Sequence, residues 1–176
     1  MHLPAGPCII RDWRKSDLAS LVAHANNRKV WLNLRDRLPH PYTEADGQAW
    51  IAYAASEDPA TNFAIEYDHE AVGSIGLTRQ SDIEFGTAEV GYWLGEAVWG
   101  RGIATASLRA FSAWAFQQFE LRRLFAGVMF HNHASRRVLE KAGFVLEGIH
   151  RRHVIKAGIV QDQAYYGLLR EDLILS

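Results

Sequence analysis

The chain of 176 residues contains a single cysteine, Cys8, so no intramolecular disulfide can form. Its apolar runs are short, far below the ~18 residues that would indicate a membrane-spanning helix. The first seven residues have neither the cationic start nor the apolar stretch of a secretory signal. From these absences we expect a cytoplasmic protein that does not engage a membrane.

A strong net charge is also lacking, because 19 Lys and Arg residues stand against 20 Asp and Glu residues. A formal charge of -1 gives no broad attraction to nucleic acid, so we expect a small molecule or a peptide as partner. Metal-ligand clusters are missing too. His131 and His133 flank one residue, and His150 and His153 lie three apart, but no cysteine or carboxylate completes a site, so we predict no metal.

What the chain does have is material for a core, since 48% of its residues are hydrophobic and only 22% are charged. At this length one core is normal, and we expect a single domain over residues 1–176. Residue periodicity and capping signals predict helices that begin near 16, 43, 103 and 134. Strands are predicted at 8–13, 63–65, 71–77, 88–94, 124–129, 144–155 and 160–169. This order indicates a mixed α/β layer fold.

A glycine-containing loop lies between the strand that ends near Leu94 and a helix with an apolar stripe. It reads WGRGIAT over residues 99–105. Glycines allow backbone N–H groups to approach a ligand closely, and a helix N-terminus carries partial positive charge, so a pyrophosphate would bind well there. The alternative is an ordinary strand-to-helix turn, because the segment fits neither the P-loop nor the full dinucleotide-binding spacing.

A second segment carries a clear resemblance. Residues 132–144 read NHASRRVLEKAGF, which resembles the Asn-x-x-Ser…Glu-Lys-x-Gly-Phe signature of GNAT acetyltransferases, and Glu147-Gly148 continues it. Together with AEVGYWL at 88–94 and the glycine loop, the pattern is similar to the RimJ/RimL branch, the ribosomal-protein N-terminal acetyltransferases. The resemblance covers roughly residues 8 to 170.

This resemblance implies the GNAT fold, a mostly antiparallel mixed sheet of about seven strands flanked by helices and splayed between strands 4 and 5. It implies acetyl-CoA as cosubstrate and no metal, and it leaves room for a homodimer. The chain departs from the family pattern at Trp99, which stands where the family usually has Gln or Arg. The residues that would hold the coenzyme by this resemblance are Trp93, Leu94, Gly100, Arg101, Gly102, Ile103, Ala104, Thr105, Asn132 and Ser135.

Two residues are candidates for the chemistry. Attack on a thioester needs a neutral amine and an acceptor for its proton. The resemblance assigns the base to Glu89, whose alternative is a paired surface carboxylate on a strand. Ser135 would protonate the departing thiolate, and its alternative is a helix residue that satisfies the first helical turn.

The sequence says less about which amine accepts the acetyl group. Deprotonating an α-amine at neutral pH costs about 1.4 kcal/mol, against about 4.6 kcal/mol for a lysine amine, which favours a protein or peptide N-terminus. A small-molecule amine is the alternative, as is a coenzyme-binding sensor without turnover. The resemblance places the acceptor wall at Trp31, Arg35, Arg37 and Tyr42, and the two arginines would favour acidic acceptors.

Overall fold

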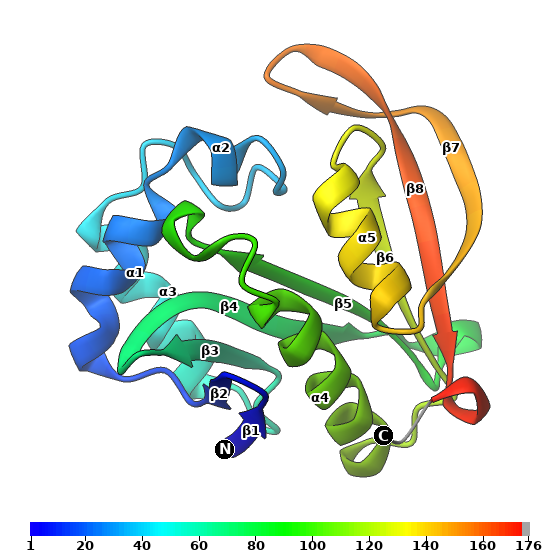
Figure 1. Cartoon of the computed structure of the whole chain (residues 1–176), viewed down its shortest axis with the longest axis horizontal. Coiled ribbons are helices and arrows are strands. Elements are labelled where there is room, and N and C mark those ends of the chain that lie inside the picture. Colours follow the sequence, from blue (N-terminus) through cyan, green and yellow to red (C-terminus); the bar gives the residue numbers. More distant parts are fainter. Residues whose placement is uncertain (174–176) are drawn as a thin grey trace.

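The computed structural model describes residues 1–173, which form one eight-stranded sheet with helices on both faces (Figure 1). The strand order is β1-β2-β3-β4-β5-β6-β8-β7, and neighbouring strands are antiparallel except for β5 and β6. The strands are β1 His2–Ala5, β2 Cys8–Arg11, β3 Asn62–Tyr67, β4 Glu70–Arg79, β5 Thr87–Leu94, β6 Arg123–Met129, β7 Val145–Lys156 and β8 Ile159–Leu169.

The helices divide between the two faces of the sheet. Helices α1 (Leu18–Ala25) and α3 (Glu44–Ser56) pack on one face with the short α2 (Arg28–Trp31), and α4 (Ile103–Gln118) and α5 (His133–Lys141) cover the other (Figure 1). Short 3-10 turns occupy Lys15–Asp17, Asp82–Glu84, Glu96–Val98 and Arg170–Asp172. Within residues 1–173, no helix is both long enough and apolar enough to cross a lipid bilayer.

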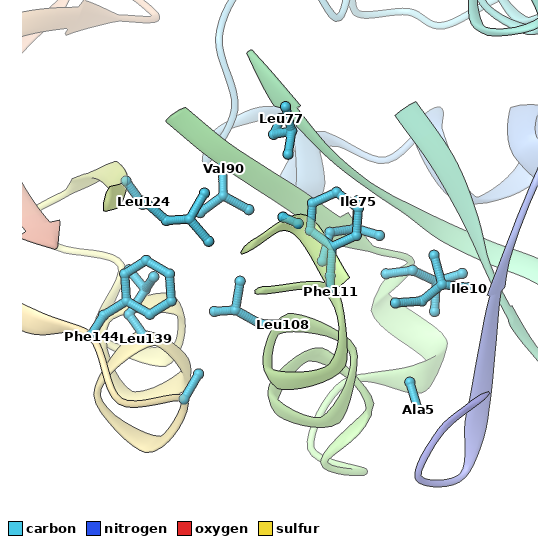
Figure 2. Packing of buried hydrophobic residues seen from close by; sticks show 14 of the residues in the cluster. Ala5, Ile10, Ile75, Leu77, Val90, Leu108, Phe111, Leu124, Leu139 and Phe144 are labelled. Carbon is cyan, nitrogen blue, oxygen red and sulfur yellow. The ribbon is translucent and has the colours of Figure 1, made fainter. Parts of the chain in front are cut away.

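The larger core lies between the sheet and α4. Leu108 and Phe111 of the predicted helical stripe are fully buried against strand residues that include Ile75 and Val90 (Figure 2). Phe111 also packs edge-on to Phe63 of β3, with ring centroids 6.0 Å apart. Spacing of three and four residues puts one helical face on the sheet, so this element could be predicted directly from its pattern.

A capping box starts α3. The Thr43 hydroxyl accepts from the Asp46 N–H at 3.3 Å, and the Asp46 carboxylate accepts from the Thr43 N–H at 2.8 Å. Both hydrogen bonds satisfy donors that the first helical turn would otherwise leave open. The predicted start of this helix is confirmed.

The first strand of the sheet was not expected. The sequence places the first strand at Cys8, but β1 precedes it and pairs with β2 through a tight turn at Gly6, whose φ is +60°. Four residues that include Pro4 give little strand signal, and proline is tolerated here because β1 is an edge strand. The sheet therefore has eight strands rather than about seven, and the splay expected between the fourth and fifth strands lies between β5 and β6.

That splay is visible in the strand register. Strand β5 pairs with β6 at three positions, and the last pair is Glu89 with Phe125. Beyond it, β5 continues to Leu94 and β6 to Met129 without pairing to each other, and Figure 1 shows the two strands diverging. An edge of unpaired backbone is thus exposed in the middle of the sheet.

Candidate active site

The splay joins two different environments because side chains alternate along β5. Val90 and Leu94 belong to the core under α4, whereas Trp93 packs against the smaller core under α1 and α3. Glu89 has the same parity as Trp93 and therefore faces the helices α1 to α3. We call the α4 and α5 side the donor face and the α1 to α3 side the acceptor face.

The glycine loop borders the donor face. Gly100 and Gly102 have φ values of +76° and +77°, which favour glycine, and Gly102 is the N-cap of α4. No side chain caps this helix, so its first amides keep their hydrogen-bonding capacity. A Cβ at either glycine would meet no protein atom within 4 Å. The loop therefore presents free N–H groups beside open space, as binding of a pyrophosphate requires.

Trp99 links this loop to strand β5. Its indole Nε1–H donates to the Leu94 carbonyl at 2.8 Å, which ties the loop to the end of β5. The aromatic residue at a position where the family usually has Gln or Arg thus has a structural contact. The same bond occupies one backbone acceptor that the resemblance assigns to pantetheine.

The backbone edge that faces the splay can be identified. The Gly95 N–H donates to the Val72 carbonyl of β4. Backbone groups of successive residues in a strand face opposite edges, so those of Trp93 face β4 and those of Tyr92 and Leu94 face the splay. The pairing with pantetheine was expected near Trp93 and Leu94; by this alternation Tyr92 offers an open N–H and C=O, and Leu94 offers an open N–H.

Asn132 and Ser135 lie at the start of α5. The Asn132 side-chain oxygen accepts from the Ser135 N–H at 3.1 Å and so caps the helix. Its amide NH2 has no hydrogen bond to any protein group within residues 1–173. Because Asn132 satisfies the helical turn, the Ser135 hydroxyl is left for another contact.

That contact is Tyr92, which the sequence analysis missed as a site residue. Its phenol oxygen lies 2.9 Å from Ser135 Oγ and 3.2 Å from the Ser135 carbonyl. Burial raises the pKa of Tyr92 to about 12, against the opposing effect of the Ser135 hydrogen bond, so the phenol is neutral at physiological pH. Period-two alternation along 88–94 was the available signal, since it places Tyr92 and Glu89 on opposite faces.

Glu89 lies on the acceptor face, where the splay opens. Its Oε1 accepts a hydrogen bond from the guanidinium of Arg35, which comes from the loop between α2 and α3. Within the described part of the chain its Oε2 has no hydrogen-bond partner. The side chain of Glu89 is 21% exposed and that of Arg35 is 62% exposed. The carboxylate is therefore paired, as the alternative interpretation expected, but one oxygen remains open.

The four residues expected to form the acceptor wall have different surroundings. Arg35 contacts Glu89, but Tyr42 is 6% exposed and packs in the smaller core. Arg37 is exposed, and its charge opposes the rise in the pKa of Tyr53 that burial and the hydrogen bond to Glu57 cause. That Arg35 and Arg37 both favour acidic acceptors stays a prediction.

Trp31, the fourth of these residues, forms a contact with the C-terminal hairpin. Its ring stacks on His40 with centroids 5.5 Å apart, and Lys156 Nζ of β7 lies 3.8 Å from the ring centroid. The wall near α2 is thus shared with β7, which the sequence analysis did not include.

Two other arginines differ in whether their side chains are free to contact a bound ligand. Arg101 lies over the ring of Tyr67 at 5.8 Å and is exposed, whereas Arg136 donates to the Tyr166 hydroxyl at 3.2 Å.

His150 and His153 stack edge to face at 5.0 Å. Across residues 1–173, no three His, Cys, Asp or Glu side chains converge as metal ligands would.

Comparisons with known proteins agree with this geometry. The acetyltransferase (GNAT) domain family matches residues 8–145. "Probable N-acetyltransferase YjcK" of Bacillus subtilis (strain 168) is 39% identical over 105 residues, which cover 60% of this chain and 58% of that protein. The ribosomal-protein-serine acetyltransferase of Escherichia coli (strain K12) is 37% identical over 89 residues, which cover 51% of this chain and 49% of that protein. The matched segments therefore span about half of the length of these relatives.

A solved structure extends the likeness to nearly the whole chain. Mycobacterium smegmatis RimJ in complex with CoA-disulfide superposes with a TM-score of 0.81 at 27% identity, over 99% of this chain and 87% of that one. The predicted fold and the resemblance to the RimJ/RimL type are confirmed. The chain belongs to the GNAT acetyltransferase family.

Proposed function

We propose that this protein is an acetyl-CoA-dependent N-acetyltransferase that transfers acetyl directly from the thioester to an amine. The observation that carries the proposal is the splay, whose donor face holds free amides and a hydroxyl pair and whose acceptor face holds a carboxylate with one open oxygen. The proposed donor and acceptor groups thus lie on opposite faces of one opening in the sheet.

Acetyl-CoA fits the donor face. The first amides of α4 and the loop from Gly100 to Thr105 would hold the pyrophosphate. The exposed Arg101 of this loop would add a phosphate contact. The pantetheine amides would pair with the open edge of β5 at Tyr92, and the Asn132 amide would donate to the same arm. This assignment rests on the α4 amides, the Tyr92 backbone and the Asn132 side-chain amide, for which residues 1–173 supply no other hydrogen-bond partner.

The chemistry follows from the two faces. Glu89 Oε2 takes the proton of the amine, directly or through water, as the nitrogen attacks the thioester carbonyl carbon. The tetrahedral intermediate then collapses, the C–S bond breaks, and the thiolate takes a proton from the Ser135–Tyr92 pair. Tyr92 remains protonated until alkaline pH, so this pair can donate throughout the physiological range.

A protein or peptide N-terminus is the acceptor that we favour. Making an α-amine neutral at pH 7 costs about 1.4 kcal/mol, while a lysine amine needs over three times as much, so a single carboxylate suits the α-amine better. The ribosomal-protein-serine acetyltransferase relative supports this choice. A small-molecule amine remains the second candidate, and a sensor without turnover fits less well because base and acid candidates are both present.

Release of free thiol from acetyl-CoA tests the proposal. The acceptors would be a short peptide with N-terminal serine and internal lysine, the same peptide with a blocked N-terminus, and spermidine. We expect turnover with the open peptide and at least about tenfold less with the blocked one. Turnover with spermidine alone would transfer the assignment to small amines. Acetyl-CoA binding without thiol release for any amine would favour the sensor.

A further inference from the structure

A buried lysine connects the C-terminal hairpin to the acceptor face. Lys156, the last residue of β7, is 1% exposed, and its Nζ donates to Asp36 Oδ1 at 2.6 Å while lying over the Trp31 ring. Asp36 is 120 residues away in the chain and its side chain is 72% exposed. Among residues 1–173, these two groups are what balances the charge of Lys156.

Such an arrangement is an inefficient way to gain stability. A buried ammonium loses its hydration, and an apolar side chain of similar size would often stabilise the same contact as well or better. An ion pair with a defined acceptor does, however, fix the position of its partner more narrowly than an apolar contact does. The contact of Lys156 with Asp36 therefore restricts where this part of the loop can lie.

The restricted residue is next to the one that holds Glu89. The loop between α2 and α3 has a tight turn in which the Leu38 N–H donates to the Arg35 carbonyl at 3.1 Å. Within this turn Asp36 is held by the hairpin, and the preceding Arg35 donates to Glu89 Oε1. Arg35 is mostly exposed and has no other carboxylate partner in the described residues, so its position depends on the loop.

We propose that Lys156 is a positioning residue for Glu89. Through Asp36 it holds the turn from which Arg35 reaches Oε1, and this orients the carboxylate with Oε2 toward the acceptor amine. The inference rests on the proposed role of Glu89 as base, and it adds β7 to the elements that prepare the acceptor face.

The first test needs no acceptor. In protein labelled with nitrogen-15, the Arg35 guanidinium signal, assigned by its loss in Arg35→Lys, should show the slow water exchange of an ion-paired group. Lys156→Met keeps the length and the contact with Trp31 but removes the charge, and Asp36→Ala removes the exposed partner. Both should speed the exchange of Arg35 by about tenfold or more. An unchanged Arg35 signal in both folded variants overturns the proposal.

The second test separates positioning from stability. With the N-terminal serine peptide, Lys156→Met and Arg35→Met should each lower kcat/KM about tenfold, and the double variant should be no worse than either alone. Lys156→Arg should recover activity to within about threefold. Acetyl-CoA affinity should stay unchanged, as it should in Lys141→Met, a lysine on α5. A double variant with a hundredfold loss would mean that the two residues act independently, which contradicts the proposal.

Glu89→Gln distinguishes a failure of this inference from a failure of the proposed function. If Glu89→Gln is inactive while Lys156→Met equals the wild type, the base assignment stands and the positioning role is wrong. If Glu89→Gln is fully active, the base assignment is wrong, and the exchange of the Arg35 guanidinium still reports whether Lys156 holds that side chain.

Discussion

The two faces of the splayed sheet are built in different ways. The donor face uses backbone amides of the glycine loop and neutral side chains, namely Asn132, Ser135 and Tyr92. The acceptor face uses long charged side chains, and its two central contacts join Arg35 to Glu89 over 54 residues and Lys156 to Asp36 over 120 residues. Donor groups thus come mostly from two short segments, and acceptor contacts depend on the completed fold.

This difference gives separate expectations for variants. Changes in the glycine loop or at Asn132 should alter coenzyme affinity, because we propose that these groups contact the part of acetyl-CoA that does not react, whereas changes in the Ser135–Tyr92 pair should alter turnover. Changes on the acceptor face should alter turnover or acceptor preference and leave coenzyme affinity intact. A glycine-loop variant that lowers turnover alone, or an acceptor-face variant that weakens acetyl-CoA binding, would break the comparison.

The largest effect should come from Glu89→Gln. The amide keeps the shape but cannot take a proton, so kcat at neutral pH should fall about 100-fold or more while acetyl-CoA affinity changes little. Steady-state kinetics from pH 6 to 9 together with calorimetry would measure both quantities.

Glu147→Gln is the matched control, because Glu147 also pairs with an arginine, Arg123 of β6, and lies on β7, away from the splay. It should keep near-normal kcat. Equal losses in the two variants would mean that broken ion pairs, and not a missing base, explain the effect.

Gly102→Val should give the next largest effect, on the other face. A β-branched residue at φ +77° strains the backbone and fills the space beside the loop, so acetyl-CoA affinity should fall about 30-fold or more. Calorimetric titration measures it. Gly158→Val is the control, since Gly158 has the same φ and open surroundings but lies in the β7–β8 turn. If both variants bound acetyl-CoA equally well, the glycine loop would have no part in the site.

Much of the fold could be predicted from the sequence because its signals are local. The stripe of α4 and the Thr43–Asp46 capping box depend on residues three or four apart, and both were predicted and confirmed. The segments at 99–105 and 132–135, which we propose to hold the coenzyme, were picked out by local patterns of the same kind. Strand β1 was not predicted, because four residues that include a proline carry almost no strand pattern.

The acceptor face was less predictable. Arg35 and Arg37 are close in sequence, yet only Arg35 forms an ion pair within the described residues. Lys156 looks like an ordinary strand lysine until the hairpin folds back over Trp31. Tyr92 was missed for a related reason, since its partner Ser135 is 43 residues away. Such pairs depend on tertiary structure, which residue spacing does not encode.

Tyr92→Phe should have a moderate effect that refines the comparison. Loss of the phenol removes one proton donor of the hydroxyl pair, so kcat should fall about tenfold with little change in coenzyme affinity. Tyr165→Phe, on β8, removes a phenol that stacks on His150 and should have no such effect. A normal kcat in Tyr92→Phe would leave protonation of the thiolate to Ser135 or solvent.

Tyr92 also has a pH signature. Its folded pKa of about 12 lies above the ordinary value near 10, so its contribution to stability is complete below about pH 10 and is lost as pH rises through about 12. In urea unfolding, Tyr92→Phe should reduce this alkaline loss of stability. An identical alkaline profile in the wild type and in Tyr92→Phe would contradict the raised pKa.

The smallest effect should come from Arg37→Glu. Arg37 is exposed and has no ion pair in the described residues, so it can attract an acidic acceptor from a distance without touching the reacting groups. Interactions between exposed charges are weak and are screened by salt. We therefore expect the Michaelis constant for an acidic peptide to rise about two- to threefold at low salt and hardly at all at high salt. A basic peptide should show the opposite shift. Arg79→Glu, at the end of β4, is the control with an equal charge change. Equal shifts from both variants would show that net charge, and not the position of Arg37, sets the preference.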